Sequence, residues 1–396
     1  MTNKPQFVGE KVRLGELIKS SGARNRDGNY ADVYSITNSK GFIPSEEYFS
    51  KEVYSKELSA YKLVSRNMIA YNPSRINVGS VGVQDKANTA IVSPLYVVFS
   101  TDATRLIPAY LVRFLKSKSG LNQIAFQSIG TVRNNLKFDA LCRMEIVLPS
   151  LETQNERLGL LGLIEDKIDL CNQQIAALSD LVKSRFVEMF GDPDSNPHGL
   201  EVCPLGEVLS VQPSNGMYKP QMDYVSDGSG TPIIRIDSFR SEGPDYSSLK
   251  RLNCNESECR RYGINENDIV INRVNSIGCM GKTMLVSHIP EVTVFESNMM
   301  RLHSDEALMI PAFLCAQMTT EFSKNYFESN AKRAIGQASI NQKDVKGLPV
   351  LLPTIGNQKA YLSIVSQVDK SRFVAQQQIE KLQMLYDSLA QEYFGD

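Results

Sequence analysis

The chain has 396 residues, of which 42% are hydrophobic and 22% are charged, and this balance is typical of a soluble protein with room for two domains. Its formal net charge of −1 argues against a generic nucleic-acid binder but leaves local DNA-binding patches open. The sequence has no apolar run long enough for a membrane span and no signal-peptide core near its start, so we expect a cytoplasmic protein.

The seven cysteines are scattered and form no CxxC pair, which favours reduced thiols over a disulfide framework. Cys254 and Cys259 can be combined with His288 or His303 as zinc ligands, but their spacing fits no common zinc pattern. We therefore expect no metal in this chain.

The first predicted domain covers residues 1–147. Short runs rich in β-branched and aromatic residues, such as Tyr96–Phe99, are separated by Gly, Asn and Ser, and a helical patch covers 107–118. This pattern predicts an α+β domain of mostly antiparallel strands with a few helices.

A repeated segment follows. Residues 148–192 recur at 352–396 with 14 identities in 45 aligned pairs. Each copy begins after a Pro-Ser or Pro-Thr pair, contains no internal proline, and places apolar residues at alternating steps of three and four. We expect two long helices that pair as an antiparallel coiled coil. The seam would consist of Leu161, Ile164, Ile168, Ile175 and Leu178 in the first helix and Val365, Val368, Ile379 and Leu382 in the second.

One charged residue, Arg372, interrupts this seam. We expect it to fix the register of the helices or to reach an acidic residue such as Glu165 or Asp169.

The second half repeats the layout of the first. A Pro-, Asp- and Gly-containing linker at 193–204 precedes a second domain at 205–350, and the second spacer helix covers 351–396. Strand-like residues occur at 231–236 and helical patches at 310–328. The two domains share short matches, including Asn67-Met68-Ile69 with Asn267-Asp268-Ile269, so we expect related folds.

The sequence contains no convincing catalytic motif. Residues 275–283 resemble the end of a phosphate-binding loop, but Ser276 stands where that motif requires its first glycine. The first half has Gly79 and Gly82 at the equivalent place without Lys-Thr, which favours a turn or close backbone packing. The three histidines form no triad or HExxH arrangement. We therefore predict a recognition scaffold with no catalytic residues.

Polar clusters in the two domains are the best candidates for function. Arg, Asn and Lys side chains read base edges in the major groove, while Ser and Tyr add backbone contacts. The clusters at 72–77 and 272–276 follow a similar predicted strand in each half yet differ in sequence, as two domains that read different bases would. The candidates are Arg24, Arg26, Asn72, Ser74, Arg75, Asn77, Arg133 and Asn134 in the first half, and Tyr218, Lys219, Asn272, Arg273, Asn275, Ser276, Lys332, Arg333, Asn341 and Lys343 in the second.

Several short motifs recur in a fixed order along the chain. The two variable domains each open with Leu-Gly-Glu, the Leu-Pro pairs are followed by Gln154 and Gln358, and the helices end in Phe-Gly-Asp; the second domain also contains Gly230–Ile236 and Asp268-Ile269-Val270. Through these motifs the chain resembles, over its whole length, the specificity subunits of type I restriction-modification enzymes. The resemblance implies a non-catalytic subunit that binds double-stranded DNA and holds two modification subunits and the restriction subunits. S-adenosylmethionine, ATP and magnesium would belong to those partners.

The resemblance also implies that the two helices act as a spacer. Each domain would read one part of an asymmetric bipartite target, and the two half-sites would be centred about one helical turn (~34 Å) apart. The main alternative is a tandem adaptor that holds protein partners on its heptad helices without binding DNA. A specificity subunit of another restriction class, an antirestriction relative and an enzyme acting alone are further alternatives.

Overall fold

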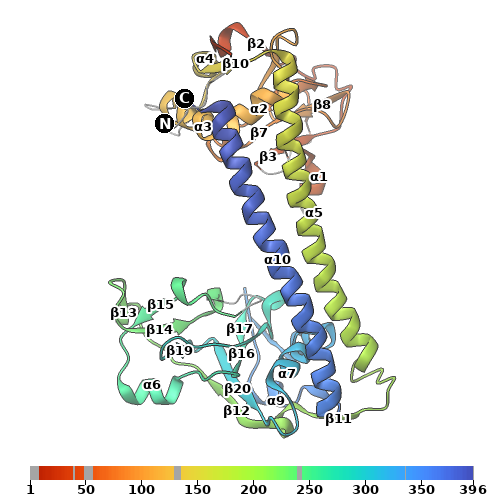
Figure 1. The fold of residues 1–396 in the computed structure, drawn as a ribbon, viewed down its shortest axis with the longest axis vertical. Helices are drawn as coiled ribbons and strands as arrows, with labels where there is room; N and C mark the ends of the chain where they lie inside the picture. The colour runs from red at the N-terminus through yellow and green to blue at the C-terminus, as the bar shows by residue number, and fades with distance from the viewer. Residues whose placement is uncertain are drawn as a thin grey trace, which may run out of the picture. The chain divides into compact units, whose positions relative to one another are not determined.

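The computed structural model of the chain describes residues 9–38, 41–48, 57–128, 135–238, 243–334 and 336–395. Two compact units divide the chain: unit 1 comprises Met1–Gln173 and Ala375–Asp396, and unit 2 comprises Gln174–Val374. Each unit contains one β-rich domain and a part of both long helices, α5 (Leu151–Phe190) and α10 (Ile355–Phe394) (Figure 1). The boundaries between the units in the sequence fall within these helices.

Both units have the predicted α+β fold with mostly antiparallel strands. Besides its part of the long helices, unit 1 contains β1 (Glu10–Arg13), β2 (Ile18–Ser21), β3 (Tyr34–Thr37), β4 (Gly41–Pro44), α1 (Ser45–Tyr48), β5 (Lys62–Ser65), β6 (Ile69–Tyr71), β7 (Val81–Val83), β8 (Thr89–Val92), β9 (Val97–Thr101), α2 (Pro108–Lys116), α3 (Lys118–Gln127), α4 (Phe138–Cys142) and β10 (Glu145–Leu148).

Unit 2 repeats this order with additional strands. It contains β11 (Glu201–Pro204), β12 (Leu209–Asn215), β13 (Tyr224–Val225), β14 (Thr231–Ile234), β15 (Lys250–Leu252), α6 (Glu256–Tyr262), β16 (Ile269–Asn272), β17 (Val274–Asn275), β18 (Thr283–Leu285), β19 (Val294–Phe295), β20 (Met299–Ser304), α7 (Pro311–Met318), α8 (Glu321–Asn330), β21 (Lys332–Ala334), β22 (Gln337–Ser339), α9 (Gln342–Lys346) and β23 (Pro349–Leu352).

The central sheet has the same strand order in both units. In unit 1 the order is β2-β9-β6-β7, and in unit 2 it is β12-β20-β16-β18. The turn before β6 contains Asn67 and the turn before β16 contains Asn267, each with a φ of 67°. Asparagine is one of the few residues other than glycine that tolerates this left-handed conformation. The weak sequence match between the two domains therefore marks a common backbone turn.

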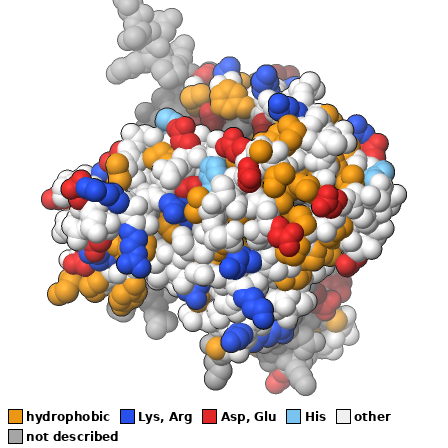
Figure 2. Space-filling view, turned by 90° about the horizontal axis from the view of Figure 1, so that it is seen from below, with side chains coloured by type: hydrophobic (Ala, Val, Ile, Leu, Met, Phe, Trp, Pro, Cys, Tyr) orange, Lys and Arg blue, Asp and Glu red, His pale blue; other side chains and the backbone are white. Residues whose placement is uncertain are grey.

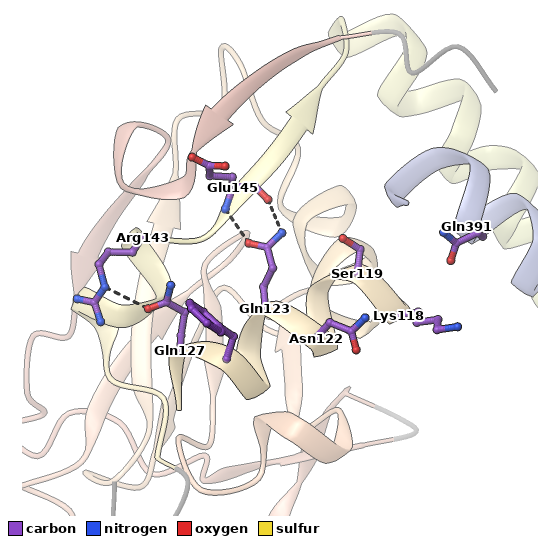
Figure 3. A pocket seen from close by; sticks show the side chains of 9 residues that line it. Lys118, Ser119, Asn122, Gln123, Gln127, Arg143, Glu145 and Gln391 are labelled. Carbon is purple, nitrogen blue, oxygen red and sulfur yellow. Dashed lines mark hydrogen bonds between the residues drawn. The ribbon is translucent and has the colours of Figure 1, made fainter. Parts of the chain in front are cut away.

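A two-stranded ribbon joins each domain to its following helix. β1 pairs with β10, and β11 pairs with β23. In unit 1 the side-chain amide of Gln123 closes the ribbon: it donates to the Glu145 carbonyl at 2.9 Å and accepts from the Glu145 amide at 2.9 Å (Figure 3). In unit 2 Gln317 pairs in the same way with Leu351. Because β11 belongs to this ribbon, the interval 193–204 expected as a linker ends in a strand.

In unit 1 the start of α5 and the end of α10 pack on α2. Figure 1 shows the end of α10 beside α2 and α3. The ring of Phe394 lies 5.0 Å from that of Tyr110, and Arg157 donates to the Tyr110 hydroxyl at 2.9 Å and stacks over Tyr393. Leu161 is fully buried in the same core. The C-terminal segment of the chain thus completes the core of unit 1.

Unit 2 has an aromatic cluster at the corresponding place. The rings of Phe186 and Phe190 on α5, Phe313 on α7 and Tyr361 on α10 lie within 5.0–5.9 Å of one another. Phe190 occupies in the first repeat the position of Phe394 in the second. The repeated Phe-Gly-Asp ending therefore supplies a core residue to each unit.

Burial along both helices follows the heptad pattern. Leu161, Ile164 and Val368 are buried, while the six other seam residues named from the sequence are half-buried between exposed neighbours. Arg372 donates to Asp369 of its own helix at 2.9 Å, and Glu165 pairs instead with Arg113. That Arg372 reaches Glu165 or Asp169 stays a prediction, because both of those carboxylates belong to unit 1 and Arg372 belongs to unit 2. Among the described helices none is both long and apolar enough to cross a membrane.

Candidate nucleic-acid interface

In unit 1 the loop that follows β6 contacts the segment that precedes α4. The Ser74 hydroxyl donates to Asn135 Oδ1 at 2.5 Å, and the Leu136 amide donates to the Pro73 carbonyl at 3.1 Å. The side chain of Asn72 shapes the loop by accepting from the Ser74 amide at 3.1 Å. Arg75 and Asn77 are exposed on the same loop. Arg133 and Asn134, the remaining candidates here, lie outside the described residues.

A second candidate loop of unit 1 is held by a buried asparagine. Asn25 is 3% exposed; its amide nitrogen donates to the carbonyls of Tyr30 and Leu58, and its Oδ1 accepts from the Tyr30 amide. Arg24 and Arg26 flank this anchor and are exposed. The hydrogen bonds of buried Asn25 thus hold the loop in place, while the guanidinium groups of Arg24 and Arg26 face solvent.

Tyr96 and Lys62 connect the two loops, and neither was predicted from the sequence. Burial raises the pKa of the Tyr96 hydroxyl, while a hydrogen bond with the Ile36 backbone, the charge of Arg75 and a hydrogen bond with Asn72 act in the opposite direction. Lys62 donates to the Tyr96 carbonyl at 2.6 Å and pairs through its backbone with Arg24. Tyr96 follows the exposed Leu95 at a turn between β8 and β9. The Pro-Leu-Tyr sequence of this turn is the only local feature that could have pointed to Tyr96 as a residue of the interface.

In unit 2 a three-stranded sheet brings the corresponding segments together. The order is β17-β22-β21, so Asn275 pairs with Ala338, which pairs in turn with Arg333. Lys332, Arg333 and Ser276 are exposed on or beside this sheet. The chain segment after β16 therefore lies beside the segment after α8, just as the loop after β6 lies beside Asn135 in unit 1.

Two candidates next to this sheet are turned inward. Asn272 is 1% exposed at the end of β16, and its Oδ1 has no hydrogen-bond partner among the described residues. Arg273 is half-buried and donates to the Ser297 carbonyl at 3.0 Å. By contrast, Ser276 is exposed, and half-buried Asn275 accepts from the Ser276 amide at 2.7 Å through its Oδ1.

The loop after β12 carries Tyr218 and Lys219. Tyr218 is 79% exposed and Met222 is 85% exposed. Lys219 is neutralised: its Nζ lies 2.7 Å from Glu258 and 3.9 Å from Asp223. The hydrogen bond with Glu258 raises the pKa of Lys219, and the same bond lowers the pKa of Glu258. This lysine is therefore less available to a phosphate than its exposed neighbours.

The last pair of candidates lies at the start of α9. Asn341 caps the helix by accepting from the amides of Lys343 and Asp344, and Asp344 accepts from the Asn341 amide in return. This capping box occupies the Asn341 side chain with a structural role. Lys343 is exposed.

The described residues contain no arrangement that we can assign to catalysis. Buried Asp268 accepts from His303 Nδ1 at 2.9 Å, but the other ring nitrogen of His303 faces Glu306 at 3.6 Å, where a triad would require a nucleophile. No group of three His, Cys, Asp or Glu side chains among the described residues is placed to hold a metal ion. A groove of about 640 Å³ in unit 1 is lined mainly by residues of α3, together with Arg143, Glu145 and Gln391 (Figure 3).

The segment that resembles a phosphate-binding loop has a packing role. Gly281 has a φ of +68°, and a Cβ atom at this position would lie 2.1 Å from the ring of Phe327. A larger residue here would displace α8 from the sheet. The glycine is therefore explained by close packing and backbone conformation.

Charge on the visible surface is mixed. Figure 2 shows Lys and Arg side chains interspersed with Asp and Glu over the face seen from below. No single-sign field covers that face, which agrees with the net charge of −1. Binding to a polyanion must then depend on local groups of cations.

The chain is similar in sequence to a family of DNA specificity subunits. The model of the type I restriction modification DNA specificity domain matches residues 197–384. The chain is 28% identical over 199 residues to a putative type I restriction enzyme MjaX specificity subunit of Methanocaldococcus jannaschii, covering 50% of this chain and 46% of that protein. It is 23% identical over 296 residues to the type I restriction enzyme StySPI specificity subunit of Salmonella potsdam, covering 72% and 63%. The matched parts thus span about half to just under two thirds of these relatives.

Solved structures share the fold over the full chain. A chain from a structure that describes the assembly of a type I restriction-modification system superimposes with a TM-score of 0.64 at 16% identity, covering 99% of both chains. The type I restriction-modification S subunit from M. genitalium gives a TM-score of 0.53 at 14% identity, covering 100% of this chain and 98% of that one. These structural matches show that the chain has the fold of type I restriction-modification specificity subunits, and the family model and relatives show that its sequence is similar to theirs.

Proposed function

We propose that this chain reads a bipartite DNA target for a type I restriction-modification enzyme and carries out no chemistry itself. One observation carries the proposal: both units place a surface segment that follows a central strand beside a second polar segment, yet the side chains differ. In unit 1 these are Ser74 and Asn135; in unit 2 they are Asn275 on β17 and, on the far side of β22, the β21 residues Lys332 and Arg333. Equivalent positions with different side chains suit two domains that read different bases.

Each unit would contact DNA in the major groove. Asn and Arg side chains make paired hydrogen bonds to adenine and guanine edges, while Lys and Ser contact phosphates. Asn72, Ser74 and Arg75 would serve unit 1, and Tyr218, Asn275, Ser276 and Arg333 would serve unit 2. Asn272 and Asn341 are less suited, because one side chain is buried and the other caps a helix.

The chemistry would come from partner subunits. Two modification subunits that bind S-adenosylmethionine would methylate adenine, and restriction subunits that use ATP and magnesium would cut DNA. The relatives support this assignment, because each is described as the specificity subunit of a type I restriction enzyme. This chain would hold those subunits over its target.

Sequencing of modified adenines tests the proposal. The chain would be expressed with a type I modification subunit from the same organism, and we expect one asymmetric bipartite motif to become methylated. Replacing residues 1–145 with the corresponding domain of another specificity subunit should change one half-site only. A change in both half-sites, or methylation independent of this chain, would overturn the proposal.

A tandem adaptor without a DNA role is the second candidate. Large apolar side chains stand exposed on the long helices, including Leu163 at 60% and Phe373 at 63%, which suits protein partners. A gel-shift assay with the modification subunit separates the two functions, since an adaptor would bind that subunit and leave the duplex unshifted.

A further inference from the structure

Two cations stand opposite each other on the surface of unit 1. Arg24 and Lys62 form an isolated antiparallel bridge, framed by hydrogen bonds from the Leu63 amide to the Ala23 carbonyl (2.8 Å) and from the Asn25 amide to the Tyr61 carbonyl (2.9 Å). Residues opposite each other in such a bridge have Cβ atoms about 5 Å apart, and like charges in these positions repel. The backbone therefore holds two positive charges together at an energetic cost.

No carboxylate among the described residues offsets this repulsion. In the part of the chain that the structure describes, neither Arg24 nor Lys62 forms an ion pair, although Lys11, Arg113 and Arg251 of the same chain do. Burial lowers the pKa of the Lys62 ammonium, and the Arg24 charge lowers it further. A dianionic or monoanionic ligand between the two groups would remove this strain.

The lysine is positioned rather than free in solvent. Its aliphatic stem passes over Gly22, where a Cβ would lie 3.6 Å from Lys62 Cδ, and its Nζ donates to the Tyr96 carbonyl at 2.6 Å. An ammonium group has three N–H donors, so two are left for a ligand beside the one that Tyr96 accepts. Arg24 is exposed and presents a guanidinium group that matches a phosphate with paired hydrogen bonds.

We propose that Arg24 and Lys62 together bind one phosphate group of the DNA backbone. The inference rests on the proposed DNA-reading function and deepens it. Tyr96 links the pair to Asn72 and Arg75 on the loop that would read bases, so a bound phosphate would set the register of the duplex on that loop. In the described part of unit 2, Lys219 on the loop after β12 is already neutralised by Glu258.

The salt dependence of DNA binding tests this site. The affinity of the full chain with its modification subunits would be measured for two duplexes, one that contains the motif methylated by this complex and one with a scrambled sequence. Each titration would be repeated between about 50 and 200 mM KCl. We expect Lys62→Met and Arg24→Gln each to weaken binding to both duplexes by the same factor, up to about 8-fold near 0.1 M salt. The double variant should reduce the slope of log K against log salt by about 0.9, the value for one phosphate.

Matched variants make the result specific. Lys62→Arg keeps the charge and should retain the slope. Lys11→Met removes a charge from the same unit, but this lysine is paired with Glu145 at 3.1 Å, so the slope should not change. If Lys62→Met fails to fold by circular dichroism, Arg24→Gln decides the matter, because it changes an exposed side chain.

Four outcomes would overturn the inference. Folded variants with unchanged slopes would show that the pair binds no phosphate. Weakening on the target duplex alone would make the pair a base-reading site, and a slope change of about 1.8 in the double variant would mean two separate phosphates. A wild-type complex that binds neither duplex would overturn the proposed function as well, so the two failures are distinguishable.

Discussion

Gln154 and Gln358 make the same three hydrogen bonds in their separate units. Gln154 Oε1 accepts from the Ile107 amide at 2.9 Å, and its Nε2 donates to the carbonyls of Arg105 (2.8 Å) and Pro149 (3.0 Å). Gln358 makes the corresponding bonds with Ile310, Leu308 and Pro353 at 2.8–2.9 Å. Both side chains are fully buried. Each therefore joins the start of a long helix to the start of the neighbouring domain helix.

Replacing either glutamine with leucine should destabilise its unit. The change leaves one amide and two carbonyls without partners in the interior, at a cost of roughly 1 kcal/mol for each lost bond, or about 2–4 kcal/mol in all. Urea unfolding would measure the loss. Hydrogen exchange would locate it, with faster exchange in α2 for Gln154→Leu and in α7 for Gln358→Leu.

Asn155→Ala is the matched control, because Asn155 is the exposed neighbour of Gln154 on the same helix. It should unfold at the wild-type midpoint. Equal exchange rates in α2 for wild type and Gln154→Leu would contradict the structural role given to this glutamine.

The repeats and seam could be predicted because their signals are local. Periodic apolar residues such as Leu161 and Ile164 identify the buried face of a helix whatever it packs on. The role of Gln154 could not be predicted, since its partners Arg105 and Ile107 are almost fifty residues away in sequence. The match of Asn67 to Asn267 indicated related domains, but only the φ angles show why asparagine is suited to both positions.

The candidate DNA-binding residues show where sequence reasoning stops. A polar residue after an apolar run looks like a loop residue, but Asn272 is the last residue of β16 and is buried. From the sequence Lys219 is expected to be a free cation, but in the structure Glu258 on α6 forms an ion pair with it. Arg24 is a candidate from the sequence but Lys62 is not, and only backbone pairing between distant segments makes them neighbours. Such properties depend on contacts between segments that local patterns do not encode.

Releasing Lys219 should strengthen DNA binding if the proposed function is right. Glu258→Gln removes the counter-ion, and glutamine can still accept from the Asn255 amide in the capping box of α6. We expect a higher affinity and a slope of log K against log salt that is steeper by up to about 0.9. The control is Glu207→Gln, at an exposed carboxylate of the same unit.

The same pair predicts how affinity depends on pH. The Lys219 hydrogen bond lowers the pKa of Glu258, so the carboxylate stays charged above that lowered pKa and the pair persists at neutral pH. The difference between wild type and Glu258→Gln should be constant from about pH 6 to 8 and shrink only as Glu258 becomes protonated in acid. A difference that disappears near pH 7 would contradict this account.

Arg113 should contribute to the stability of unit 1 through both long helices. It donates to Glu165 on α5 and, at 2.9 Å, to the Tyr386 hydroxyl on α10, and the Arg113 side chain is 23% exposed. Glu165→Gln leaves the guanidinium group without its carboxylate. Since Glu165 is itself 42% exposed, we expect a loss of only about 1–2 kcal/mol in the free energy of unfolding.

A double-mutant cycle with Arg113→Met measures this coupling. Tyr386→Phe, which removes one neutral hydrogen bond, should cost about 1 kcal/mol or less. Additive losses for Glu165→Gln and Arg113→Met would show that the pair contributes nothing to stability beyond its separate residues.

An insertion in α5 tests the proposed spacer role of the long helices. Four added residues near Asn172 add one turn, or about 6 Å, and continue the heptad seam as a local stutter. If the helices set the spacing of the half-sites, the methylated motif should keep both half-sites and gain about two base pairs between them, at ~3.4 Å each. Adenine-methylation sequencing would read the new gap.

The same four residues inserted after Asp194, in the loop beyond the end of α5, should leave the gap unchanged. An unaltered gap with the helix insertion, in a complex that still methylates DNA, would mean that the spacing is set by the partner subunits instead.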